Sequence, residues 1–194
     1  MSVVAWAMFV LSLVLASFYD TWLLAFTVGF GLALVSSAMG FLLAARRATR
    51  IANAVIFMGF AALFIQQMHG MIEMHFGIFV LLAFLLFYRD WIPLVVAALA
   101  IAVHHLGFHF LQGQGVGVYV FPGPCGIGIV FVHAASVVFE TALLVYMAIR
   151  SQQEALGAEE VMALGSRTRV DGSIDLCIKK GTAVNLANAS KSFC

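Results

Sequence analysis

The chain has 194 residues, of which 63% are hydrophobic and only 10% are charged, and its mean hydropathy is +1.06. Soluble domains are about 45–50% apolar and about 25% charged, so the composition excludes an ordinary soluble protein. It predicts an all-α, polytopic helical bundle in the lipid bilayer. The net charge of +1 provides no basic surface, so we expect no nucleic-acid partner.

Six apolar segments are candidates to cross the bilayer. A helix rises 1.5 Å per residue, so roughly 20 residues span a hydrocarbon core of about 30 Å. The first and fourth segments are short, and the fourth would tilt or locally thin the bilayer. The predicted spans are 3–18, 22–44, 51–68, 74–88, 91–112 and 127–149.

Basic residues are confined to segments that six spans would place on one side of the membrane. None precedes Arg46, so the first span lacks the charged flank of a signal peptide and is expected to remain as a helix. The positive-inside rule identifies the basic side as the cytoplasm, which would hold both termini. The basic residues are Arg46, Arg47, Arg50, Arg89, Arg150, Arg167, Arg169, Lys179, Lys180 and Lys191.

Composition changes after Arg150, where a polar tail follows the last apolar span. We therefore expect two parts, a transmembrane sensory domain over 1–150 and a cytoplasmic linker or stalk over 151–194. Residues 151–164 are good helix formers and could continue the sixth span. The stretch 172–194 is too small to bury a core of its own, and we expect the chain to be cut short there.

All six histidines fall in the apolar stretch 69–133, in which Arg89 is the single Lys or Arg. The expected topology puts them in the outer half of the membrane, because spans three and five end there and span six begins there. This segregation predicts a polar site in one leaflet. The histidines are His69, His75, His104, His105, His109 and His133.

Helical spacing indicates which histidines could act together. Residues four apart share a helix face, so His105 and His109 form a pair, whereas His104 points about 100° away. Joined by His133 or His75, this pair would supply three or four metal ligands. Neutral imidazole suits zinc, copper or haem iron, and a haem would need only two histidines.

Two other interpretations of the histidines stay open. Ionisable groups inside a membrane are costly and usually face a partner or an aqueous cavity, so the histidines could form a proton-binding or quinone pocket. A membrane histidine can also simply hydrogen-bond to a neighbouring helix, which contributes about 0.6 kcal/mol on average.

Two glutamates are candidate partners of the histidines. His133 and Glu140 are seven apart and share one stripe of the sixth span. Glu140 would lie near the midplane, where it must be protonated or paired with a histidine or arginine, and we expect a coupling role for it. His69 and Glu73 would align only if the third span continues past Gly70.

The run Tyr88-Arg89-Asp90-Trp91 places a charge pair between two aromatic residues at the cytoplasmic interface. This is the usual arrangement of an interfacial anchor, and we expect Arg89 and Asp90 to form a turn there.

The sequence offers no sign of enzyme chemistry. It has no nucleophile elbow, no P-loop and no HExxH motif. The spacing of His69, Glu73 and His75 differs from that of a metalloprotease, because the glutamate is not adjacent to the first histidine. We therefore expect a protein that is not an enzyme.

Several short motifs occur in order along the central part of the chain: 70–79 (GMIEMHFGIF), 82–84 (LAF), 88–91 (YRDW), 104–105 (HH), 111–112 (LQ) and 133–140 (HAASVVFE). Together they resemble the N-terminal multi-span sensory region of bacterial methyl-accepting chemotaxis proteins, and related input regions of diguanylate cyclases and histidine kinases. The resemblance implies a sensor in the bacterial inner membrane, acting as a homodimer and followed by a cytoplasmic signalling module that is missing here.

These observations predict a membrane-embedded sensory input module for chemotaxis or signal transduction. It would sense a metal, a redox state or a small ligand through the outer-leaflet His/Glu cluster, and the signal would leave through the sixth span. The alternative is a membrane redox protein that holds haem or copper with the same histidines and exchanges electrons with quinone. A transporter is a third class, but we see no inverted repeat that would support it.

Overall fold

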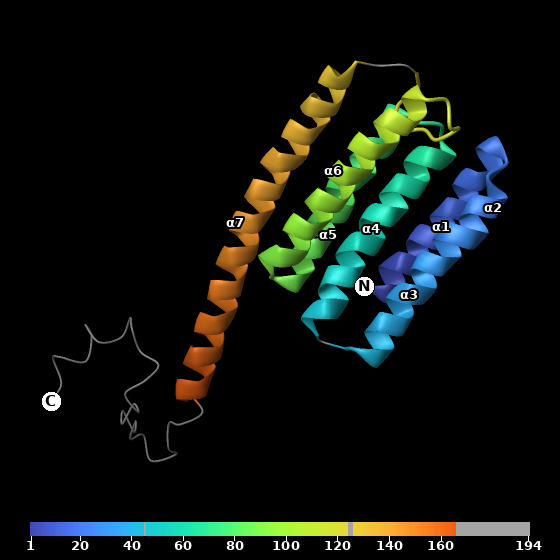
Figure 1. Ribbon diagram of the computed structural model, residues 1–194. Coiled ribbons are helices and arrows are strands. Elements are labelled where there is room, and N and C mark those ends of the chain that lie inside the picture. The colour runs from blue at the N-terminus through green and yellow to red at the C-terminus, as the bar shows by residue number, and fades with distance from the viewer. Residues whose placement is uncertain (45, 124–125, 166–194) are drawn as a thin grey trace, which may run out of the picture. The chain divides into compact units, whose positions relative to one another are not determined.

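The computed structural model describes residues 1–44, 46–123 and 126–165. Within these residues all regular secondary structure is helical and no strand is present, which confirms the predicted all-α class (Figure 1). The elements are α1 (Ser2–Tyr19), α2 (Trp22–Leu24), the π-helix η1 (Ala25–Gly29), α3 (Phe30–Leu42), α4 (Arg47–Gln67), the 3₁₀-helix η2 (Ile72–His75), α5 (Phe76–Leu85), the 3₁₀-helix η3 (Leu86–Tyr88), α6 (Trp91–Gly113) and α7 (Ile127–Gly165).

Each of the six predicted spans corresponds to a helical segment. Five are long and apolar enough to cross a membrane, namely Ser2–Tyr19, Trp22–Leu42, Arg47–Gln67, Trp91–Gly113 and Ile127–Ala163. The fourth predicted span is the shorter apolar run Ile72–Tyr88, built from η2, α5 and η3. Its tightened 3₁₀ ends add length, since a 3₁₀-helix rises about 2.0 Å per residue.

Helix α4 is the centre of the packing. It lies among α1, α3, α5 and α6, and twelve of its 21 residues are buried. Phe57 and Phe60 are fully enclosed there. The other long helices turn most of their apolar surface outward, as expected where lipid covers the outer face.

Polar contacts join the N-terminal ends of α4 and α6 at one end of the bundle. Asp90 is only 5% exposed and caps α6 by accepting a hydrogen bond from the amide of Ile92, at 3.2 Å. Its carboxylate also lies 3.4 Å from Arg50 and 3.6 Å from Arg47. The predicted anchor at residues 88–91 is therefore also a helix cap and an ion-pair site, while Trp91 is half-exposed.

Helix α7 continues past Arg150, where the composition becomes more polar, to Gly165. This confirms the predicted helical continuation over residues 151–164. The rest of the predicted linker, 166–194, lies outside the described residues. All contacts discussed below belong to one compact unit, Met1–Gln153.

Candidate functional site

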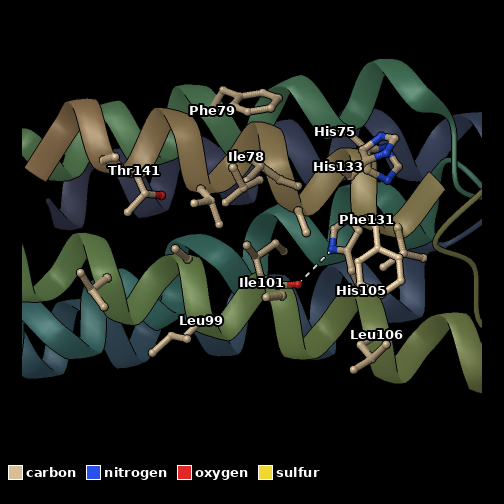
Figure 2. Close-up of a pocket in the computed structure, with 18 of the residues that line it drawn as sticks. His75, Ile78, Phe79, Leu99, Ile101, His105, Leu106, Phe131, His133 and Thr141 are labelled. Atoms are coloured by element: carbon tan, nitrogen blue, oxygen red, sulfur yellow. Dashed lines mark hydrogen bonds between the residues drawn. The ribbon is translucent and has the colours of Figure 1, made fainter. Parts of the chain in front are cut away.

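Three histidines from three different segments meet at one place in the bundle. His75 ends η2, His105 lies on α6 and His133 lies on α7. The ring centroids of His75 are 5.2 Å from those of both His105 and His133, and the last two are 6.5 Å apart. We call these residues the histidine cluster; Figure 2 shows them gathered at one end of a cavity.

Each ring of the histidine cluster is oriented by the same local contact. Its Nδ1 faces the backbone carbonyl four residues earlier in the chain, at 3.2 Å for His75, 3.0 Å for His105 and 2.9 Å for His133. A carbonyl oxygen can only accept, so Nδ1 must carry the proton. In the neutral imidazole Nε2 then presents a lone pair.

The outward-facing nitrogens of the two most enclosed rings have no partner in the described part of the chain. His75 is 3% and His105 is 7% exposed, and the Nε2 atom of each is buried without a hydrogen bond of good geometry, although the backbone of Val120 also approaches the His75 ring. An unpaired buried acceptor is costly, typically about 1–3 kcal/mol. Two such atoms side by side therefore indicate a ligand site.

Phe121 closes the cluster on the side of the α6–α7 connection. Its ring is stacked 5.7 Å from His75 and lies 5.5 Å from His133 and 6.3 Å from His105. Gln112 holds it in place: the side-chain oxygen accepts from the amides of Val120 and Phe121, and the side-chain NH₂ donates to the Phe121 carbonyl at 2.7 Å.

A second glutamine and a glycine hold the same connection against α4. Gln66 accepts from the amide of Tyr119 at 2.8 Å and donates to the carbonyl of Gly117 at 3.3 Å. Gly70 adopts φ +79°, and a Cβ on it would lie 2.4 Å from the backbone carbon of Phe121. The sequence prediction missed these supporting residues, although glutamine next to an apolar segment signals a need for a polar partner.

The cavity beside the histidine cluster has a volume of about 520 Å³ and lies among α5, α6 and α7. This is within the usual range for small-molecule pockets, which are mostly apolar with a few placed polar groups. The cluster supplies the polar groups at one end, and Thr141 lies at the other (Figure 2). Between them the walls are aliphatic and aromatic, with Ile78, Phe79, Leu99, Ile101, Val137 and Val138 among them.

The predicted pairing of His105 with His109 is replaced by a different grouping. The ring contacts of His109 are with Phe110 and Phe121, and His109 lines a separate hollow with Gln112. His104 packs its ring 4.1 Å from Phe108 and 5.4 Å from His105, and both of its ring nitrogens are buried without a hydrogen bond among the described residues. Spacing along one helix could not identify the partners of His105, because they come from other helices.

His69 also lies outside the histidine cluster. Helix α4 ends at Gln67, and His69 adopts φ +51°, so the chain turns before Glu73. The condition for aligning His69 with Glu73 on one helix is therefore not met. Instead the His69 ring packs between Tyr19, at 4.3 Å, and Tyr119, at 4.5 Å.

Glu140 shares helix α7 with His133, as predicted. Its Oε2 atom is buried and finds no hydrogen-bond partner among the described residues, so the histidine or arginine partner predicted for it is not seen there. The hydroxyl of the next residue, Thr141, is likewise buried and unpartnered within that part of the chain.

The described residues contain no group of three or more His, Cys, Asp or Glu that could hold a metal ion. The three- or four-ligand zinc or copper site predicted as one alternative is therefore not supported by them. A haem held by two histidines stays a prediction.

Comparisons of the chain with family models, with curated proteins and with solved structures find no match. The functional argument therefore rests on the histidine cluster, the cavity and the helix that carries His133.

Proposed function

We propose that this chain is the membrane-embedded sensory input module of a signal-transduction receptor of the chemotaxis type. One observation carries the proposal: the histidine cluster joins η2, which leads into α5, and α6 to α7, and α7 is the helix that continues to Gly165. A ligand that bridges the cluster would change how α7 packs on its neighbours. Such helix displacements are a common form of signal transmission.

The loose packing of α7 supports a role as the moving element. In its apolar window 22% is buried, the same share as in α6 and in Trp22–Leu42 and far below the 61% of the central helix α4. A cavity of about 520 Å³, lined by residues of α5, α6 and α7, lies where α7 faces these two helices. An element that buries few apolar contacts shifts at lower free-energy cost than one at the centre of the core.

The order of the sequence motifs supports the same assignment. Three of the motifs that resemble the chemotaxis sensory regions contain the histidine cluster: 70–79 includes His75, 104–105 includes His105, and 133–140 includes His133 and Glu140. Three histidines that occur in the motifs carrying the resemblance are thus also neighbours in space. A shared ligand site is a direct reason for such a grouping.

The proposal includes an orientation and partners. The arginines at residues 46, 47, 50 and 89 lie in or beside the α3–α4 and α5–α6 connections, which are at the same end of the bundle (Figure 1). By the positive-inside rule this end faces the cytoplasm of a bacterial cell. The module would act as a homodimer, deliver its signal to a cytoplasmic signalling module, and perform no catalysis itself.

The test joins the chain to the kinase-controlling module of a chemotaxis receptor and measures kinase activity in bacterial membranes. His133→Gln should shift the basal kinase activity or abolish the response to a change in respiratory state, because it alters the cluster on the output helix. Ser136→Ala is the control on the same helix and should leave both unchanged, because Ser136 is exposed and its hydroxyl donates to the Val132 carbonyl within α7. Equal activity and response in the wild type and His133→Gln would contradict the proposal.

A further inference from the structure

The hydrogen-bond character of the histidine cluster limits what it can bind, and this inference rests on the proposed function. All three Nδ1 atoms donate to backbone carbonyls, so all three Nε2 atoms are acceptors in the neutral rings. Two of these acceptors are buried and unpartnered in the described part of the chain. The matching ligand group is therefore a hydrogen-bond donor.

The length and lining of the cavity limit the size and polarity of the rest of the ligand. His133 and Thr141 are eight residues apart on α7, which corresponds to about 12 Å along the helix. Almost everything between them is apolar. A ligand that fills this space has a polar head at the histidine cluster and a hydrocarbon body beside α7.

The cavity is reached from the side of the bundle. Four of its wall residues are also exposed on the outside, namely Leu99, Leu106, Phe131 and Val138. Since these positions belong to membrane-spanning helices, the surrounding phase is lipid. The ligand would therefore be a molecule dissolved in the bilayer.

Other ligand classes fit these groups less well. A carboxylate or phosphate would direct its own lone pairs at three acceptors, and an ammonium ion would enter an apolar cavity without a counter-charge there. No metal-holding group of three or more ligands is found in the described residues. A neutral hydroxyl group on an apolar body matches both the acceptors of the histidine cluster and the apolar walls of the cavity.

We propose that the site binds membrane quinols and discriminates against the oxidised quinones. A quinol carries two O–H donors, whereas the quinone carries carbonyl oxygens that can only accept. Sites built to bond a hydroxyl reject the analogue that lacks it, because their own polar groups are then left unpaired. The module would thus report the reduction state of the quinone pool by binding alone, without electron transfer.

The test measures binding to the purified full chain in lipid nanodiscs by anaerobic titration calorimetry. The probes are a decyl-substituted benzoquinol, the corresponding quinone, and the dimethyl ether of the quinol, which keeps the ring and the tail, replaces each O–H by a slightly larger O–CH₃, and so lacks both donors. The quinol should bind at least about tenfold more tightly than either of the others. Equal affinity for the quinol and the ether would overturn the proposal, whichever variants fold.

Variants then locate the site. His75→Gln and His105→Gln should each reduce the preference for the quinol at least about fivefold, whereas Ser136→Ala, at an exposed position of α7 that does not line the cavity, should retain it. A preference that survives both cluster variants would place the site elsewhere and overturn the assignment. Zn²⁺ binding that is lost in the same variants, together with equal affinity for quinol and quinone, would replace it by a metal site.

The kinase measurement separates this inference from the proposed function. If His133→Gln alters kinase activity while the quinol shows no preference, the module is a sensor of something else. If the quinol preference is present and the kinase is unaffected by His133→Gln, the ligand is correct and the sensory role is wrong.

Discussion

At the scale of single residues, Gly70 shows how closely the segment above the histidine cluster is packed. Its φ of +79° favours glycine, and an added Cβ would lie 2.4 Å from the backbone carbon of Phe121 and 2.5 Å from its carbonyl oxygen. Because these are backbone atoms, no side-chain rotation can relieve the contact. The backbone of Phe121 would have to move, and its ring, which closes the histidine cluster, would move with it.

We therefore predict that Gly70→Ala destabilises the protein by about 1–3 kcal/mol. The control is Gly77→Ala, since Gly77 lies within α5 and an added Cβ meets nothing within 4 Å. That change should be neutral or stabilising by up to about 1 kcal/mol. Thermal unfolding in detergent measures the stability of both variants. Equal melting temperatures would show that the close contact at Gly70 does not limit which residue is tolerated there.

At the scale of the elements, Asp90 links the start of α6 to the start of α4. It caps α6 through the amide of Ile92 and pairs with Arg47 and Arg50. Arg47 has a side chain that is 67% exposed, so its pair contributes little, while the pair with Arg50 is more enclosed. The cap and the ion pairs can be separated by substitution, because asparagine also caps helices well.

Asp90→Ala should lower stability more than Asp90→Asn, by about 1 kcal/mol, because only the alanine removes the cap. For a chain of this size that difference corresponds to about 2–4 °C in melting temperature. Raising the salt concentration should weaken the wild type more than Asp90→Asn, since salt screens the ion pairs. If the alanine and asparagine variants melt together, capping by Asp90 does not stabilise α6.

At the scale of the whole molecule, the orientation in the membrane is open to direct measurement. After replacement of the native cysteines, Gln114→Cys should react with a membrane-impermeant maleimide on intact cells. Arg89→Cys should react only after the cells are opened, because the positive-inside rule places residue 89 in the cytoplasm. The two positions are both exposed, so accessibility within the protein does not bias the comparison. The opposite labelling pattern would invert the topology and move the histidine cluster to the cytoplasmic leaflet.

Much of the architecture could be predicted from the sequence. An apolar segment in lipid must satisfy its backbone N–H and C=O groups with internal hydrogen bonds, and therefore forms a helix. The six segments, the short fourth one and the helical continuation after Arg150 follow from length and composition, and all are helical in the structure. The end of α4 was harder to predict, because the left-handed position of its terminating turn is taken by His69 rather than glycine: the amides of His69 and Gly70 bond back to the carbonyls of Gln66 and Ile65, and the His69 ring packs against Tyr19 and Tyr119.

The sequence by itself determined that this is a helical chain suited to a membrane, with six histidines concentrated in one stretch. The tertiary structure alone decided which three act together. His75, His105 and His133 are up to 58 positions apart in the chain, and helical periodicity relates only residues within one helix. The packing of α5, α6 and α7 around one cavity brings them within 6.5 Å of one another, and it does not do so for His109 or His69.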